Sequence, residues 1–382
     1  MGPPGRALLR HFGLPRAKRQ PPSCDRNISS RMPESFLKKA LWGFQPYVPG
    51  EQPPDGEGWV KLNTNESPLP PSPKVIEAIK SAIDDSLRLY PSPTAAPARA
   101  AIAAQLDVNA AQVAVGNGAD ELIEMCFRAF AGKGEHVAYP TPTYPLFEPL
   151  CRIHEAVPHP HAMAEGWTWT DELAQDHAPL KFIVNPNSPT GTWSPESAVE
   201  DVVARSRGVV VLDEAYVDFA PESCAGLIEK HRNLLVLRTL SKSYALAGMR
   251  VGFALGDPEL IDALDAVRDS YNMDRLAIVA AVAAIQDQDH HRQIVEHVVA
   301  ERAWLAEQLR EQRFEVSPSA ANFLFVEPPP GSSAPAVADA LRERQILIRH
   351  YDREPIARWL RITIGTRDQH ERLLSALKEI IQ

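Results

Sequence analysis

One lysine of this chain stands in a setting suited to covalent chemistry. Lys242 lies between Ser241 and Ser243, follows the apolar run Leu234–Leu237, and precedes Arg250 by eight residues. Small hydroxyl side chains, alanine and glycine around a lysine are what a packed, phosphate-lined pocket requires. A lysine amine that is held and desolvated in such a pocket is nucleophilic toward a carbonyl. The segment therefore predicts a Schiff-base lysine if the rest of a coenzyme site lies elsewhere in the chain.

A second chemical segment follows the apolar run Gly208–Leu212. Asp213 comes directly after it, and Tyr216 three residues later. Ligands of open α/β sheets bind at the carboxyl ends of the strands. A carboxylate at that edge could keep a pyridine nitrogen protonated, which strengthens the electron sink of a pyridoxal coenzyme, and Tyr216 could reach the phenolic oxygen of the coenzyme. The alternative is an Asp that caps the next helix with Tyr216 packed beneath it.

A glycine-containing turn precedes an expected helix over Ala119–Phe130. Gly116-Asn117-Gly118-Ala119-Asp120 offers backbone N–H groups and a helix dipole, which together can bind a phosphate. The segment is not a dinucleotide fingerprint, because Glu121 stands where the third glycine would fall. A plain turn in which Asp120 caps the helix is the alternative.

Two proline-rich loops and one strand arginine complete the set. The loop over residues 185–191 could present the amide of Asn187 or the hydroxyl of Ser188 to a ring oxygen, and its Asn–Pro bond can be cis. The loop over residues 140–145 could place Tyr144 against an aromatic ring. Arg361 alternates with apolar neighbours and could grip a substrate carboxylate. A structural salt bridge is the alternative for Arg361.

The elements that must position these residues alternate between short apolar runs and helical patterns. We expect buried strands over Val113–Val115, His136–Tyr139, Lys181–Val184, Val209–Leu212, Leu234–Leu237 and Val251–Leu255. The helical stretches between them, such as Pro195–Arg207, predict an α/β fold with helices over both faces of a mostly parallel sheet. After about residue 275, a long amphipathic run through Leu309 precedes apolar runs over Ala321–Val326, Ile346–Arg349 and Leu360–Ile364, which predicts a smaller α+β unit.

Composition narrows the class of protein. The chain has 382 residues, of which 44% are hydrophobic, and this length suffices for two domains. A net charge of −9 argues against nucleic-acid binding, and no apolar run approaches the roughly 20 residues that span a bilayer. Four scattered cysteines fit a reducing cytosol, so we expect a cytoplasmic protein. We expect no metal site, because prolines separate His159 from His161 and His290-His291 lacks nearby carboxylates.

Taken in order, these segments resemble the fold-type-I pyridoxal-phosphate aminotransferases, and specifically the histidinol-phosphate aminotransferase family, from about Leu41 to the C-terminus. The resemblance implies a pyridoxal 5′-phosphate coenzyme on Lys242, which would also carry the proton between the substrate Cα and the coenzyme. Asp213 would pair with the pyridine nitrogen, Tyr216 with the phenolic oxygen, and Tyr144 would stack on the ring. The implied phosphate contacts come from Gly118, Ala119, Asp120, Ser241 and Arg250 and, across a homodimer, from Tyr90.

The resemblance also implies which residues face the substrate: Tyr47, Asn65, Tyr271, Arg349 near the substrate phosphate, and Arg361 on a carboxylate. Three departures are visible. One is the segment His350-Tyr351 after Arg349, which is not the commonest pattern and bears on the identity of the substrate. Asn187-Ser188-Pro189 stands where most relatives have Asn-Asn-Pro, which leaves open whether Asn187 or Ser188 contacts the coenzyme ring oxygen. Ser270 replaces the usual proline before Tyr271, which bears on the identity of the substrate.

The activity implied is transamination between histidinol phosphate and 2-oxoglutarate, in histidine biosynthesis. An aromatic amino-acid aminotransferase and a threonine-phosphate decarboxylase are the alternatives, because both use the same coenzyme residues. The expected partners are small substrates and a second copy of the chain, without nucleic acid or membrane. The expected organisation is a basic disordered tail (1–31), an arm (32–73), a large coenzyme-binding domain (74–278) and a small domain (279–382). The tail could also be sequence ahead of a start at Met32, and a transit peptide is the alternative.

Overall fold

The computed structural model describes residues 36–53 and 58–381, so the predicted tail over residues 1–31 lies outside the described part. The chain divides into two compact units, residues 1–48 and residues 49–382. In the first unit the described residues contain one short 3₁₀ helix, η3 (Lys39–Leu41). All elements named below belong to the second unit. In the described part of the chain, no helix combines the length and the apolar character needed to cross a membrane.

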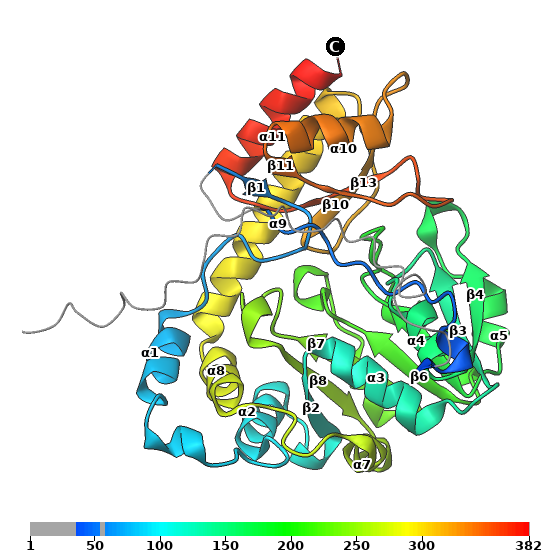
Figure 1. Cartoon of the computed structure of the whole chain (residues 1–382), viewed down its shortest axis with the longest axis vertical. Helices are drawn as coiled ribbons and strands as arrows, with labels where there is room; N and C mark the ends of the chain where they lie inside the picture. Colours follow the sequence, from blue (N-terminus) through cyan, green and yellow to red (C-terminus); the bar gives the residue numbers. More distant parts are fainter. Residues whose placement is uncertain (1–35, 54–57, 382) are drawn as a thin grey trace, which may run out of the picture. The chain divides into compact units, whose positions relative to one another are not determined.

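A seven-stranded sheet with the order β2-β8-β7-β6-β5-β3-β4 forms the larger half of the second unit (Figure 1). Only β8 runs antiparallel to its neighbours, so the predicted mostly parallel sheet is confirmed. The six expected strands are all present, because both faces of the sheet are covered and its strands are therefore continuously apolar. The strand bounds are β2 Val113–Asn117, β3 His136–Thr141, β4 Val157–Ala162, β5 Leu180–Val184, β6 Val209–Asp213, β7 Leu234–Thr239 and β8 Val251–Gly256.

The edge strand β4 was not predicted from the sequence. Its six residues, Val-Pro-His-Pro-His-Ala, contain no apolar run, and five of the six are exposed. An edge strand tolerates proline at positions that face away from the neighbouring strand, where a missing N–H breaks no ladder bond. The position of β4 at the end of the sheet therefore explains both its composition and the failure of the pattern to reveal it.

Helices cover the two faces of this sheet and create two cores. Val210 and Leu212 of β6 face one core, and Val211 faces the other, as alternation along a strand requires. The first core takes residues from α1 (Pro73–Ser81), α2 (Ala96–Leu106), α5 (Asp171–Gln175), α6 (Glu196–Arg205) and α8 (Arg275–Ile285). The second takes residues from α3 (Ala119–Phe130), α4 (Phe147–Ile153) and α7 (Pro258–Val267). The 3₁₀ helices are η4 Asp85–Arg88, η5 Ala110–Gln112, η6 Glu165–Trp167, η7 Val217–Phe219, η8 Ala225–Glu229 and η9 Ala247–Met249.

A third core belongs to the C-terminal part. It lies among α9 (Gln288–Glu311), α10 (Ala334–Glu343), α11 (Arg367–Ile380) and a four-stranded sheet with the order β12-β13-β10-β9. Figure 1 shows α9 running from beside α8 to these strands. The strand bounds are β9 Glu315–Val316, β10 Phe323–Glu327, β12 Arg349–His350 and β13 Leu360–Thr363. The boundary predicted between residues 278 and 279 falls inside α8, which is buried in the first core through Ile285, so the cores divide after that helix.

The expected strand over Ile346–Arg349 is in fact two strands. β11 (Ile346–Leu347) pairs in parallel with β1 (Val60–Lys61), whereas Arg349 and His350 form β12 and pair antiparallel with β13. The chain passes from one sheet to the other at Ile348, because β11 pairs with β1 and β12 pairs with β13. In this register Arg349 lies directly opposite Arg361.

Candidate active site

Lys242 follows β7, and the two residues after it are anchored by contacts with other segments. Ser243 donates a hydrogen bond to Asp218, and the ring of Tyr244 stacks on His291 of α9 with centroids 4.1 Å apart. The amine of Lys242 lies 5.7 Å from the centre of the Tyr216 ring. Within residues 36–53 and 58–381 this amine makes no hydrogen bond or ion pair. Burial, reinforced by the nearby positive charge of Arg361, lowers the pKa of Lys242 to about 8, so a substantial fraction is neutral and nucleophilic near pH 8.

Asp213 ends β6, the strand beside β7, and its side chain is buried. One carboxylate oxygen accepts a hydrogen bond of 2.9 Å from the N–H of Ala215. Asp213 forms no ion pair within the described part of the chain. Burial raises the pKa of Asp213 to about 6. A buried carboxylate without a cation is unfavourable, so this position suits a ligand that brings a positive group. The local turn to Ala215 leaves the second oxygen for that purpose.

Tyr216 packs edge-on against Phe323, and its hydroxyl accepts a hydrogen bond of 2.9 Å from the amide of Asn65. Asn65 is itself buried, and its side-chain oxygen accepts a hydrogen bond from the hydroxyl of Thr363. The amide is thus used within the protein, where it orients Tyr216. The contact of Asn65 with a substrate stays a prediction.

The structure distinguishes the two neighbouring candidates in the loop over residues 185–191. The amide of Asn187 accepts from Thr143 at 2.9 Å and donates to the carbonyl of Pro142 at 3.0 Å, so it braces the two proline-rich loops against each other. The hydroxyl of Ser188 instead accepts a hydrogen bond of 3.2 Å from Arg361. Ser188, and not Asn187, is the member of this pair that lies beside the other site residues.

The start of α3 forms an anion-binding corner. Gly118 occupies the N-cap with a φ of +84°, and no side chain caps the first turn, so the alternative in which Asp120 caps the helix is wrong. Asp120 instead accepts hydrogen bonds from the hydroxyl of Tyr144 at 2.9 Å and from Arg250 at 3.3 Å. Arg250 also reaches the hydroxyl of Ser241 at 3.5 Å. Free N–H groups, a guanidinium and a hydroxyl at one helix start are suited to a phosphate.

A close backbone approach fixes this corner. A Cβ on Gly252 of β8 would lie 2.5 Å from the backbone nitrogen of Ala119, and a Cβ on Gly118 would lie 2.5 Å from the Arg250 guanidinium. Only glycine leaves room at these two positions. The corner therefore depends on the packing of β8 directly beneath the start of α3.

Two arginines of the C-terminal sheet face each other across β12 and β13. Arg361 donates to Ser188 and to the carbonyl of Asn63, its Nε has no hydrogen-bond partner, and it forms no ion pair among the described residues. The alternative of a structural salt bridge is thus not supported. The ring of Tyr351 lies under both guanidinium groups, 5.4 Å from Arg349 and 5.7 Å from Arg361. Sequence reasoning missed Tyr351, although an aromatic residue two positions after Arg349 was a visible signal.

Two other predicted residues, Tyr90 and Tyr271, lie apart from this group. Tyr90 and Tyr271 stack on each other with centroids 4.5 Å apart, and their exposed fractions are 77% and 41%. No contact joins this pair to Lys242 within residues 58–381. Tyr47 belongs to the first compact unit, and its role stays a prediction.

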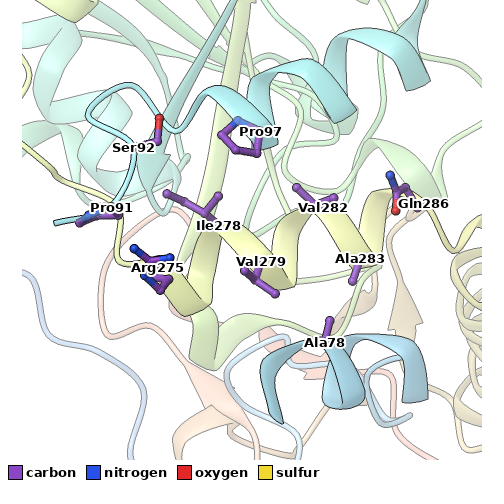
Figure 2. Close-up of a pocket in the computed structure, with 10 residues that line it drawn as sticks. All are labelled: Ala78, Pro91, Ser92, Pro97, Arg275, Ile278, Val279, Val282, Ala283 and Gln286. Carbon is purple, nitrogen blue, oxygen red and sulfur yellow. The ribbon is translucent and has the colours of Figure 1, made fainter. Parts of the chain in front are cut away.

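A separate apolar pocket of about 410 Å³ lies beside the segment that carries Tyr90 (Figure 2). Side chains of α1, α2 and α8 line it together with Pro91 and Ser92, and Arg275 is its only charged lining residue. None of the residues discussed above lines this pocket. The chemically active group therefore lies elsewhere, at the carboxyl ends of β6 and β7.

Comparison with known proteins agrees with this arrangement. The model of the family described as "Aminotransferase class I and II" matches residues 57–377. The chain belongs to the class I and II aminotransferase family. The predicted fold-type-I architecture and aminotransferase activity are thereby confirmed.

Individual members of this aminotransferase family can be compared directly. A histidinol-phosphate aminotransferase of Geotalea uraniireducens is 40% identical over 344 residues, which cover 90% of this chain and 99% of the relative. Histidinol-phosphate aminotransferase 1 of Bradyrhizobium diazoefficiens is 46% identical over 356 residues, with coverages of 91% and 99%. The crystal structure of the Sinorhizobium meliloti histidinol-phosphate aminotransferase in complex with pyridoxal-5′-phosphate superposes with a TM-score of 0.79 at 29% identity, covering 84% of this chain and 90% of that one.

The unpaired carboxylate of Asp213 has a measurable consequence for the aminotransferase without bound ligand. The pKa of Asp213 lies above its ordinary value of 3.8 in the folded state, so the native state loses stability as pH rises from about 4 to about 6. A rise to about 6 corresponds to on the order of 3 kcal/mol. In ligand-free protein, Asp213→Asn should therefore increase the free energy of unfolding by that order at pH 8, with the gain vanishing below pH 4. Urea unfolding at both pH values measures this, and a gain that does not change with pH would contradict it.

Proposed function

We propose that this aminotransferase uses pyridoxal 5′-phosphate and exchanges an amino group between histidinol phosphate and 2-oxoglutarate. The observation that carries the substrate assignment is the pair Arg349–Arg361, directly opposite each other on neighbouring strands. Like charges directly opposite each other on neighbouring strands are destabilising, and an anion bound between the two guanidinium groups would reduce that repulsion. A phosphate monoester and a dicarboxylate each bring two negative charges, whereas an aromatic amino acid brings one.

The relatives support the same assignment. The proteins from Geotalea and Bradyrhizobium, 40% and 46% identical, are named histidinol-phosphate aminotransferases. Threonine phosphate also carries two anionic groups, but the decarboxylase of Porphyromonas gingivalis that acts on it is only 21% identical and shares the fold alone. Transamination of histidinol phosphate is therefore the activity that we assign.

The residues present fit the coenzyme. When bound, pyridoxal phosphate supplies an aldehyde that condenses with amino groups and a protonated ring that accepts electron density. We assign the unpaired carboxylate of Asp213 to the pyridinium nitrogen. The start of α3, Ser241 and Arg250 would hold the phosphate, and the hydroxyls of Tyr216 and Ser188 would meet the ring oxygen. The ring of Tyr144, fixed by its hydrogen bond to Asp120, would lie against the coenzyme.

Lys242 is then the residue that moves the proton. Its neutral amine would take the proton from the substrate Cα, and the ammonium formed would donate it to the coenzyme, for which a pKa of about 8 is well matched to near-neutral pH. Asn65 keeps the hydroxyl of Tyr216 in place during these steps. Arg361 and Arg349 orient the anionic end of each substrate, so that the amino group faces Lys242.

We propose that the functional form is a homodimer in which Tyr90 reaches the coenzyme phosphate of the partner. The segment before it exposes large apolar side chains: Ile76, Ile83, Leu87 and Leu89 are 39–58% exposed. A patch of this kind marks an interaction surface, and the apolar pocket of Figure 2 adjoins it. Sedimentation at micromolar concentration should give twice the chain mass of 42.2 kDa, and a monomer would contradict the proposal.

Lys242→Ala tests the coenzyme assignment. The variant should lose the visible absorbance that lysine-bound pyridoxal phosphate gives to the purified protein, because no amine remains to condense with the aldehyde. Lys230→Ala, which removes an exposed lysine, should keep that absorbance. Persistence of the absorbance in Lys242→Ala would show that another residue holds the coenzyme.

Arg349→Ala tests the substrate assignment. The half-reaction with histidinol phosphate should slow by about 10–100-fold in kcat/KM, since a hydrogen bond between charged groups contributes about 1.5–3 kcal/mol. The half-reaction with phenylalanine, which offers no second anion, should change little. Arg344→Ala removes a surface arginine paired with Glu379 and is the matched control. Equal losses with both donors would rule out a phosphate contact by Arg349.

A further inference from the structure

Three potential metal ligands meet at the exposed edge of the large sheet. His159 and His161 lie on β4, and Asp176 follows α5. Residues two apart on a strand point to the same face, so the two imidazoles lie side by side, with ring centroids 4.7 Å apart. The prolines beside these histidines were expected to prevent a shared metal site, but they do not keep the two rings apart. The N–H groups of Val157 and Met163 bond to the β3 side, so the alternate positions, Pro158 and Pro160, face the free edge.

The ring nitrogens converge on one atom. Nδ1 of His159 lies 2.6 Å from Oδ2 of Asp176, and Nε2 of His161 lies 2.8 Å from the same oxygen. The three ligand atoms all lie within 4.8 Å of one another. Tetrahedral bonds of about 2.0–2.1 Å place ligand atoms roughly 3.4 Å apart. Side-chain rotations that move each ligand atom by less than about 1 Å therefore suffice to admit an ion with bonds of this length.

Asp176 is held so that only Oδ2 faces the histidines. Its other oxygen accepts a hydrogen bond of 2.7 Å from the N–H of Ala178, and its backbone carbonyl accepts one of 3.1 Å from Lys181. Lys181 is buried and also bonds to the carbonyl of Leu173 and the hydroxyl of Ser206. The carboxylate is thus oriented by contacts outside the histidine pair, as a metal ligand must be.

We propose that His159, His161 and Asp176 bind one divalent transition-metal ion of the zinc class. Two imidazole nitrogens and one carboxylate oxygen form a donor set that zinc and its neighbours accept, whereas magnesium and calcium prefer oxygen ligands alone. The ring of His159 is about half exposed, which leaves an entry path and a position for water. The ion would tie the edge strand β4 to the connection between α5 and β5. This is a stabilising role, separate from the transamination site.

The test uses the full chain with its coenzyme, without an affinity tag and freed of metal by a chelator. Co²⁺ should bind once per chain and produce d–d absorption at wavelengths longer than those of the coenzyme, and Zn²⁺ should displace it. Asp176→Asn and His161→Gln should each weaken Co²⁺ binding at least about 100-fold, beyond the 10–100-fold typical for loss of outer partners. Zn²⁺ should raise the Tm of the parent protein and not of these variants.

Two matched histidine variants complete the experiment. The ring of His136 packs edge-on against His159 without joining the ligand group, and His290 lies far along the chain on α9. His136→Gln and His290→Gln should both keep Co²⁺ binding. Absence of saturable binding by the parent, or binding that survives in His161→Gln with normal circular dichroism, would overturn the proposal. Loss of binding in His136→Gln equal to that in His161→Gln would overturn the ligand set.

Discussion

The site depends on two buried groups of opposite charge that the fold holds near each other without pairing them. Asp213 ends β6 and Lys242 follows β7, and these neighbouring strands are tied in register from Val210–Leu234 to Asp213–Leu237. Burial raises the pKa of the Asp213 carboxyl and lowers that of the Lys242 amine, because it disfavours the charged form of each group. A bound partner for either charge would offset this cost. A ligand with a pyridinium nitrogen and an aldehyde satisfies both at once. The rest of the site, including the anion-binding start of α3, surrounds the space between them.

The C-terminal sheet adds two arginines of like charge on neighbouring strands. Arg349 and Arg361 lie opposite each other because the chain changes sheet at Ile348 and joins β13. Arg361 also donates to Ser188 of the large sheet's loop, and Asn65 joins Tyr216 to Thr363. The first of these hydrogen bonds couples Arg361 to the loop beside Lys242. In the function that we propose, a doubly anionic substrate would bind between the two arginines and bring its amino group to the lysine.

Much of this was predictable from the sequence, and the failures have specific causes. The six expected strands appeared because sheets covered on both faces have continuously apolar strands. β4 did not appear, since its sequence Val-Pro-His-Pro-His-Ala has no such run. The sequence could not show that the amides of Asn65 and Asn187 also hydrogen-bond within the protein, because their partners Thr363, Thr143 and Pro142 lie far along the chain. Tyr351 was missed because its position under two guanidinium groups depends on strand pairing.

The sequence by itself determined the α/β fold and the kind of chemistry, because both are written in local patterns: apolar runs, turn residues, and a lysine between serines. Only the tertiary structure decided which of two adjacent loop residues, Asn187 or Ser188, lies beside Arg361. The same holds for the opposition of Arg349 to Arg361 and for the convergence of His159 and His161 on Asp176. Each of these depends on strand register and on contacts between segments far apart in the chain, which no local pattern contains.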